Sequence, residues 1–235
     1  MNGLAERLAE VRGRIASACA RAGRDPASVI LVAVTKGFPA DAIRAAMALG
    51  VTDFGENRVQ EAEPKILAVI PRPRWHLVGH LQTNKARRAV QLFDEVQSLD
   101  SAHLAEELAK RVEATGRVLP CLVEVNTSGE ASKFGVEPGG ALELLERCRA
   151  LRPLRPHGLM TIGPLGGGPE GARAAFRSLR ELRDRAVAAG LLEAGADLSM
   201  GMSDDFEIGI EEGATYVRVG TALFGARPAG AAPVG

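Results

Sequence analysis

The stretch ILVAVTKGFP (residues 30–39) contains five consecutive apolar residues, then a threonine, a lysine and a turn signal in Gly37 and Pro39. A short apolar run bounded by Gly and Pro is typical of a strand buried on both faces. An ammonium group is among the groups least often fully buried. Lys36 therefore indicates either that the strand has reached solvent or that an amine is needed where the strand ends.

The same pattern recurs along the whole chain. Short apolar runs alternate with segments rich in Ala, Leu, Glu and Arg, which predicts parallel strands joined by helical crossovers. Strands are expected at residues 30–36, 52–55, 74–80, 95–99, 119–126, 155–161, 197–201 and 215–220. Helices are expected over residues 4–18, 40–49, 58–66, 84–92, 102–114, 141–151, 170–189 and 204–212.

Eight strand–helix units predict the α/β class and a single (β/α)8 TIM-type barrel with an extra N-terminal helix. A doubly wound open sheet is the alternative, since a weak strand such as 52–55 is easily miscounted. The 235 residues suit one barrel. We expect the barrel to cover residues 1–227 and residues 228–235 to form a flexible tail, because the tail has few large apolar groups.

Composition argues against several classes of function. The 29 Lys plus Arg balance the 29 Asp plus Glu, so no net charge favours nucleic acid or an anionic membrane as a partner. Cys19, Cys121 and Cys148 are widely spaced, which predicts neither a disulfide framework nor a zinc site and fits a reducing cytoplasm. The N-terminal segment is too charged for a signal peptide, and no apolar run is long enough to span a membrane.

Lys36 gains meaning from the predicted barrel, whose active site lies at the carboxyl ends of the strands. Alternation along a strand puts Val32, Val34 and Lys36 on one face. If the valines face the interior, Lys36 reaches the catalytic rim. Partial desolvation lowers the pKa of an amine and favours the neutral nucleophile, which suits a Schiff base with an aldehyde or ketone. A lysine that extends from the rim to solvent explains the pattern equally well.

The last two strands end in LSMGMSDD (198–205) and YVRVGTALFG (216–225), each with a glycine, a hydroxyl residue and then a helix. Such loops after strands seven and eight commonly bind phosphate in barrels, and backbone N–H groups at a helix start bind anions. N-capping by Ser203 is the alternative. The residues that offer hydroxyls or close backbone approach are Ser199, Gly201, Ser203, Gly220 and Thr221.

Arg218 is expected to share the inward face of strand eight with Tyr216, where a guanidinium needs an acceptor or an anion. An ion pair with Glu56 or Glu124 would explain it equally well. A lysine for an aldehyde, a phosphate site and a buried cation on one rim together indicate pyridoxal 5′-phosphate (PLP).

Three weaker signals come from polar residues near the predicted rim. His76 and His80 lie about 13 Å apart on a strand, too far to share a metal ion, so we expect no metal site and a core role for His76. We expect His80 at the rim, where it approaches the cofactor and counts among the cofactor-binding residues. Asn57 by itself predicts a helix N-cap. Lys133, in the loop after strand five, is expected to be exposed to solvent.

These motifs together resemble the pyridoxal phosphate homeostasis proteins, which share the barrel fold of the alanine racemase N-terminal domain. The resemblance covers nearly the whole chain and is carried by AVTKGFP (33–39), DFGENRVQEAEPK (53–65), WHLVGHLQTNK (75–85), EASKFG (130–135), HGLMTIGP (157–164) and residues 198–227. It implies that Lys36 carries the PLP imine, that Asn57 lies beside the ring hydroxyl and that Arg218 faces the pyridine nitrogen. It implies that the phosphate is held by Ser199, Gly220, Thr221 and the backbone of the turn that includes Met200 and Gly201.

The resemblance also implies a binding protein rather than an enzyme. Arginine does not hand a proton to the pyridine nitrogen, so the ring is a weak electron sink. Racemases of this fold use a tyrosine from an additional domain of a partner subunit, and we expect no equivalent here, since Tyr216 is expected below the rim. We therefore expect a cytoplasmic monomer for PLP homeostasis, with apo PLP-dependent enzymes as candidate recipients. A PLP-dependent racemase and a Schiff-base aldolase without cofactor are the alternatives.

Overall fold

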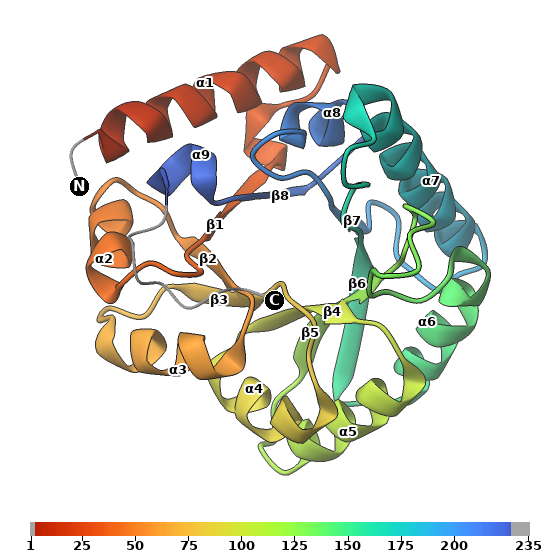
Figure 1. Ribbon diagram of the computed structural model, residues 1–235. Coiled ribbons are helices and arrows are strands. Elements are labelled where there is room, and N and C mark those ends of the chain that lie inside the picture. The colour runs from red at the N-terminus through yellow and green to blue at the C-terminus, as the bar shows by residue number, and fades with distance from the viewer. Residues whose placement is uncertain (1–2, 227–235) are drawn as a thin grey trace.

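The apolar runs of the chain form eight parallel strands that pair in sequence order, and the eighth pairs with the first to close a barrel (Figure 1). The computed structural model describes residues 3–226. The strands are β1 (Ile30–Val34), β2 (Asp53–Glu56), β3 (Arg74–Leu77), β4 (Glu95–Leu99), β5 (Leu119–Glu124), β6 (Leu154–Met160), β7 (Asp197–Ser199) and β8 (Tyr216–Val219). The predicted (β/α)8 barrel is confirmed and the doubly wound alternative is wrong. The predicted tail, 228–235, lies outside the described residues.

Helices surround the barrel on its outer side (Figure 1). They are α1 (Leu4–Arg21), α2 (Ala40–Ala48), α3 (Val59–Ala68), α4 (Ala86–Leu92), α5 (Ala102–Glu113), α6 (Ala141–Ala150), α7 (Gly168–Ala188), α8 (Phe206–Glu211) and α9 (Thr221–Phe224), with 3₁₀ turns at Pro26–Ser28, Thr83–Lys85 and Pro138–Gly140. Within the described part of the chain, no helix is both long and apolar enough to cross a membrane.

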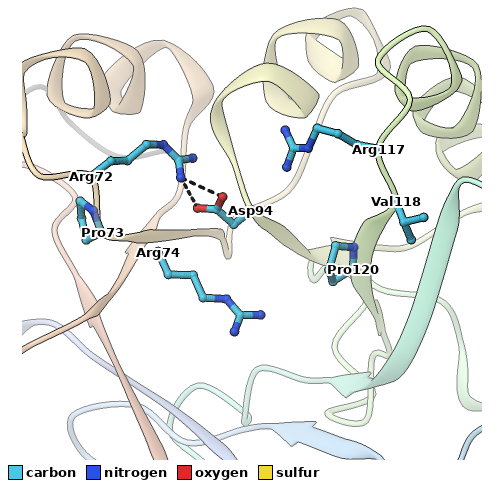
Figure 2. Close-up of a pocket in the computed structure, with 7 residues that line it drawn as sticks. All are labelled: Arg72, Pro73, Arg74, Asp94, Arg117, Val118 and Pro120. Carbon is cyan, nitrogen blue, oxygen red and sulfur yellow. Dashed lines mark hydrogen bonds and ion pairs between the residues drawn. The ribbon is translucent and has the colours of Figure 1, made fainter.

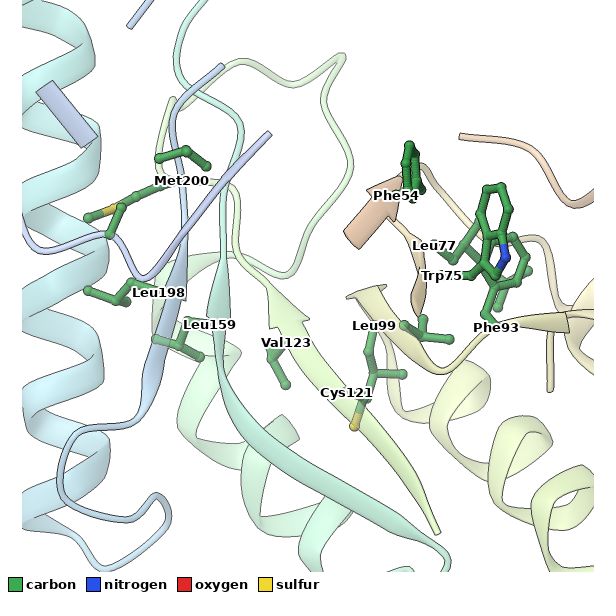
Figure 3. Packing of buried hydrophobic residues seen from close by; sticks show 14 of the residues in the cluster. Phe54, Trp75, Leu77, Phe93, Leu99, Cys121, Val123, Leu159, Leu198 and Met200 are labelled. Atoms are coloured by element: carbon green, nitrogen blue, oxygen red, sulfur yellow. The ribbon is translucent and has the colours of Figure 1, made fainter. Parts of the chain in front are cut away.

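The main apolar core lies between the strands and these helices. Strand side chains such as Phe54, Trp75 and Leu77 are fully buried, and Figure 3 shows them on the outer face of the sheet together with Leu198 and Met200. The rings of Phe54 and Trp75 pack with their centroids 5.8 Å apart. Burial of a single Phe side chain contributes roughly 1.5–3 kcal/mol, so this layer supplies much of the stability that holds the barrel in shape.

The inner face of the sheet carries charged side chains as well as apolar ones. Paired residues of parallel strands lie at one level and point to one side, and Val32 pairs with Arg218 while Val34 pairs with Gly55. Because Arg218 hydrogen-bonds to groups inside the barrel, Val32 and Val34 also face the interior, as predicted. The barrel therefore encloses charged side chains that need partners.

The N-terminal helix α1 packs against α8 and α9, the two short helices that follow the last strands (Figure 1). Its predicted apolar stripe, from Leu4 to Ala18, is buried. Arg14 pairs with Glu207 of α8 at 2.8 Å, and Arg7 Nε donates to the carbonyl of Leu223 in α9 at 2.8 Å. The extra helix thus supports the two loops that were predicted to bind phosphate.

Candidate functional site

Lys36 lies at the carboxyl end of β1, but not on the strand. β1 ends at Val34, and the predicted strand end at Lys36 is wrong by two residues. The Thr35 N–H still bonds to Gly55 O at 3.0 Å, and the Phe38 N–H then bonds back to Thr35 O at 3.0 Å, which closes a turn around Lys36. Gly37 has φ of +77°, a conformation that favours glycine. The Lys36 side chain is half-buried.

Arg218 is buried inside the barrel and held by two described acceptors. Its Nη1 donates to Ser199 Oγ at 2.6 Å and its Nη2 to Thr161 O at 2.7 Å. Burial lowers its pKa to about 10, against the opposing effect of Glu124 and Asp205. The guanidinium therefore stays charged at neutral pH.

Glu56 and Glu124, the two carboxylates considered as partners of Arg218, have different surroundings. Glu56 pairs with Lys65 at 2.8 Å instead. Glu124 is buried, and its Oε2 has no hydrogen-bond partner among the described residues. Burial, followed by the charge of Asp100, raises the pKa of Glu124 to about 7 against the opposing charge of Arg218. Glu124 is thus the carboxyl group that Arg218 influences through its charge.

Ser199 belongs to a hydrogen-bonded chain inside the barrel rather than to the rim. Its hydroxyl accepts from Arg218 and donates to Gln97 Oε1 at 2.7 Å. Gln97 Nε2 bonds to Glu95 Oε1 at 3.0 Å and to His76 Nδ1 at 3.2 Å. His76 has the predicted core position. The Ser199 side chain, fully buried, is therefore occupied in orienting Arg218.

Glu95 and His76 lie at one end of this series of hydrogen bonds, and each stabilises the charged form of the other. Burial alone would raise the pKa of Glu95, but the hydrogen bond and charge of His76, with the charges of His157 and Arg74, lower it to about 2. Burial alone would lower the pKa of His76, but its bonds to Asp53 and Glu95 raise it. The opposite directions of the two pKa shifts mean that His76 and Glu95 each favour the charged form of the other.

The loops after β7 and β8 meet, as the phosphate-site prediction requires. Ser203 Oγ accepts from the Ala222 N–H at 3.2 Å, so the first loop touches the start of α9. The predicted capping by Ser203 is wrong, because the N-cap of α8 is Asp205, whose Oδ1 accepts from Met202 N–H at 2.6 Å. Thr221 is exposed beside this contact, in the first turn of α9.

The glycines and Met200 of these loops contribute through the backbone. Gly201 has φ of +95°, and a Cβ there would lie 2.6 Å from Phe206 Cα, so only glycine fits. A Cβ at Gly220 would lie 3.3 Å from Val34 O. The backbone that follows β8 therefore lies close to the end of β1. The Met200 side chain is buried in the outer core, so only its main chain can face a ligand.

Asn57 and His80 follow neighbouring strands at the same end of the barrel. Asn57 is half-buried, and the interpretation as an N-cap is wrong because Arg58 holds that position in α3. A Cβ at Gly79 would lie 2.7 Å from Asn57 Cα, so the β3 loop packs directly on Asn57. His80, predicted as the last strand residue, lies three residues beyond the end of β3 and bonds to Asp100 Oδ2 at 3.0 Å.

The loop after β5 crosses the rim. Its Phe134 ring stacks on the His80 ring, with centroids 3.7 Å apart and planes at 8°. Lys133 is not exposed as predicted: 13% of its side chain is accessible, because its amine bonds to Gly163 O and pairs with Glu130. This loop therefore links the β3 and β6 sides of the barrel mouth.

A pocket of about 490 Å³ opens at the opposite end of the barrel, among residues at or just before the starts of β3, β4 and β5 (Figure 2). Its arginines have structural partners. Arg72 pairs with Asp94 and donates to Leu92 O at 2.7 Å, and Arg117 donates to Val90 O at 3.1 Å. Since cations and donors near the carboxyl end of a helix satisfy its last carbonyls, we interpret these arginines as caps of α4. Over residues 3–226 no cluster of His, Cys, Asp and Glu suits a metal ion.

Comparison with known proteins defines the class of this barrel. The family model of the alanine racemase N-terminal domain matches residues 7–228. An alanine racemase from Clostridium difficile has the same fold, with a TM-score of 0.75 over 98% of this chain and 58% of the racemase, at 15% identity.

Closer relatives place the chain within this class. It is 46% identical to the pyridoxal phosphate homeostasis protein of Pseudomonas aeruginosa, over 98% of this chain and 99% of the relative. The corresponding values for the protein of that name from Aquifex aeolicus are 45%, 94% and 97%. PipY of Synechococcus elongatus, solved with PLP bound, is 39% identical with a TM-score of 0.82, over 94% of this chain and all of PipY. The chain belongs to the family of pyridoxal phosphate homeostasis proteins.

Proposed function

We propose that this protein binds PLP through Lys36 and takes part in PLP homeostasis without efficient turnover of amino acids. The relatives that carry the homeostasis name and the PLP-bound structure of PipY support PLP as the ligand. The observation that carries the proposal is Arg218, a buried cation fixed by Ser199 and Thr161 at the end of the barrel that also bears Lys36.

The residues at the carboxyl end of the barrel fit three groups of PLP: the aldehyde, the pyridine nitrogen and the phosphate. Lys36 lies in a turn fixed on both sides, which suits a bond to the aldehyde. Arg218 presents a permanent cation for the pyridine nitrogen. The joined loops after β7 and β8 offer the Ser203 and Thr221 hydroxyls and the backbone at Gly201 for the phosphate.

The roles of the chain's own residues follow from their charge and burial. When bound, PLP would supply a reactive aldehyde. Lys36 would supply the amine that holds it. Arg218, with a pKa of about 10, keeps its proton at neutral pH and donates hydrogen bonds without protonating its partner. Ser199 and Thr161 O fix the orientation of its guanidinium, and we assign to Ser203 the phosphate role that the sequence suggested for Ser199.

The described residues offer no tyrosine base of the racemase type. Tyr216 is the single tyrosine of the chain, and it lies inside the barrel with its ring centroid 5.9 Å from that of His76. Burial raises its pKa, and the charges of Glu95 and Asp197 raise it further. With its pKa raised, the Tyr216 phenol stays protonated at neutral pH and so does not serve as a base there. The site therefore binds the aldehyde but is poorly equipped to remove an α-proton.

We further propose that the protein is a cytoplasmic monomer that exchanges PLP with apo-enzymes. The test is incubation of the PLP-loaded protein with common amino acids in deuterated water, followed by NMR. We expect α-proton exchange far below roughly 1–1,000 per second, the range of ordinary enzymes. Exchange within that range, lost in Lys36→Ala, would make the protein a racemase-like enzyme. Transfer of bound PLP to an apo-enzyme, measured as regained activity, tests the carrier role.

A further inference from the structure

Helix α3 carries a buried lysine, Lys65, that contacts the turn around Lys36. Its Nζ donates to Thr35 O, the carbonyl that precedes Lys36, at 2.8 Å. The same amine bonds to Glu56 Oε1 and Glu61 Oε1, each at 2.8 Å. Only 10% of the Lys65 side chain is accessible. These contacts join one helix to the strand ends of β1 and β2.

Glu61 completes the arrangement on the other side of Lys36. Its Oε1 accepts a hydrogen bond from the Gly37 N–H, the group that follows Lys36. Burial alone would raise the pKa of Glu61, but the bonds from Gly37 and Lys65 outweigh it and lower the pKa. Glu61 is therefore ionised at neutral pH. Both peptide groups that flank Lys36 are thus held from α3.

The second carboxylate of the cluster fixes the same turn through a side chain. Thr35 Oγ1 donates to Glu56 Oε1 at 2.6 Å. Burial raises the pKa of Glu56, and the charge and hydrogen bond of Lys65 oppose this rise. Removal of Lys65 alone would leave a buried carboxylate without its cation, which is strongly destabilising. A test of Lys65 therefore has to neutralise Glu56 as well.

We propose that Lys65 and Glu61 are positioning residues that hold the backbone of Lys36 where its amine meets the aldehyde of PLP. The inference rests on the proposed function. β1 has already ended at Val34, so the helix contacts, with the Thr35 and Phe38 turn bonds, determine where the Lys36 backbone lies. A displacement of about 1 Å at a reacting group costs on the order of 100-fold in rate. The aldehyde step should therefore depend on Lys65 more than the phosphate contacts do.

The experiment compares wild type with the double variant Lys65→Met/Glu56→Gln, which removes the buried cation and anion together. Two quantities are measured: the rate of PLP bonding, followed by absorbance and by borohydride trapping, and the affinity for pyridoxamine 5′-phosphate, which has an amine in place of the aldehyde. Lys110→Met, on the exposed side of α5, is the matched control. Glu61→Leu is measured as a second variant, which also keeps the test decisive if the double variant does not fold, because the Glu61 side chain is 29% accessible and less critical to the core.

We expect PLP bonding to slow by about 10- to 100-fold in the variant, with less than about a twofold change in pyridoxamine 5′-phosphate affinity and no change in Lys110→Met. Wild-type bonding rates in the double variant and in Glu61→Leu would overturn the inference. Equal losses for both ligands would assign Lys65 a general structural role and also overturn it. The proposed function fails separately, if wild type forms no bond between PLP and Lys36.

Discussion

Glu124 at the end of β5 should make the protein without PLP less stable as the pH rises. The residue is 3% exposed, and its Oε2 has no described hydrogen-bond partner. Burial, followed by the charge of Asp100, raises the pKa from 4.5 to about 7 despite the opposing Arg218. A folded-state pKa above the unfolded value means that folding favours the protonated form. The stabilising contribution is therefore complete below about pH 4.5 and is lost as the pH rises through about 7.

The size of this effect follows from the two pKa values. The difference between 4.5 and about 7, at about 1.36 kcal/mol for each pKa unit, corresponds to about 3 kcal/mol. In Glu124→Gln the side chain keeps its shape but cannot ionise. Relative to the variant, wild type should lose about 3 kcal/mol of unfolding free energy between about pH 4 and about pH 9.

Urea unfolding of both proteins without PLP, at several pH values across this range, measures the difference. The matched control is Glu143→Gln, because the Glu143 side chain on α6 is 70% accessible and should show no pH-dependent difference from wild type. Parallel pH profiles for wild type and Glu124→Gln would refute the argument. A wild type that gains stability over the variant with rising pH would also refute it, because Glu124 would then have to be stabilised as a carboxylate.

Three further substitutions test the site and the core. Thr221→Ala, at an exposed hydroxyl, should weaken PLP binding by about 10- to 150-fold with unchanged unfolding free energy; unchanged affinity in a PLP titration would move the phosphate elsewhere. Ser199→Ala should instead cost about 1–3 kcal/mol of stability without PLP, because buried donor and acceptor groups of Arg218 and Gln97 lose a partner, and an unfolding curve identical to wild type would count against this chain. Phe54→Ala should cost about 3–5 kcal/mol in urea unfolding, since the ring is fully buried; a loss below about 1 kcal/mol would mean that the outer core refills the space.

The fold could be predicted because apolar periodicity reports burial directly. The predicted starts of β1, β3, β4, β5 and β7 agree with the structure, whereas several predicted strand ends were too late. At Lys36, for example, the alternation of buried residues continues after the backbone pairing of β1 has ended, because the rim of a barrel is also shielded from water. Periodicity measures burial, and it does not report where backbone pairing stops.

The site was predictable only as far as strand order determines position. Lys36, Arg218 and the two glycine loops follow from the carboxyl ends of strands in a barrel. Ser199 and Ser203 share one motif, and only strand geometry separates the buried hydroxyl from the one beside α9. Lys65 was missed, because its contact with Thr35 depends on how α3 packs rather than on any local pattern.

The covalent link to Lys36 is the central claim, and borohydride reduction of the PLP-loaded protein followed by peptide mass mapping tests it most directly. The account predicts a pyridoxyl group on Lys36 and loss of the label in Lys36→Ala. A label mainly on Lys85 or Lys133, or equal labelling of wild type and Lys36→Ala, would contradict it.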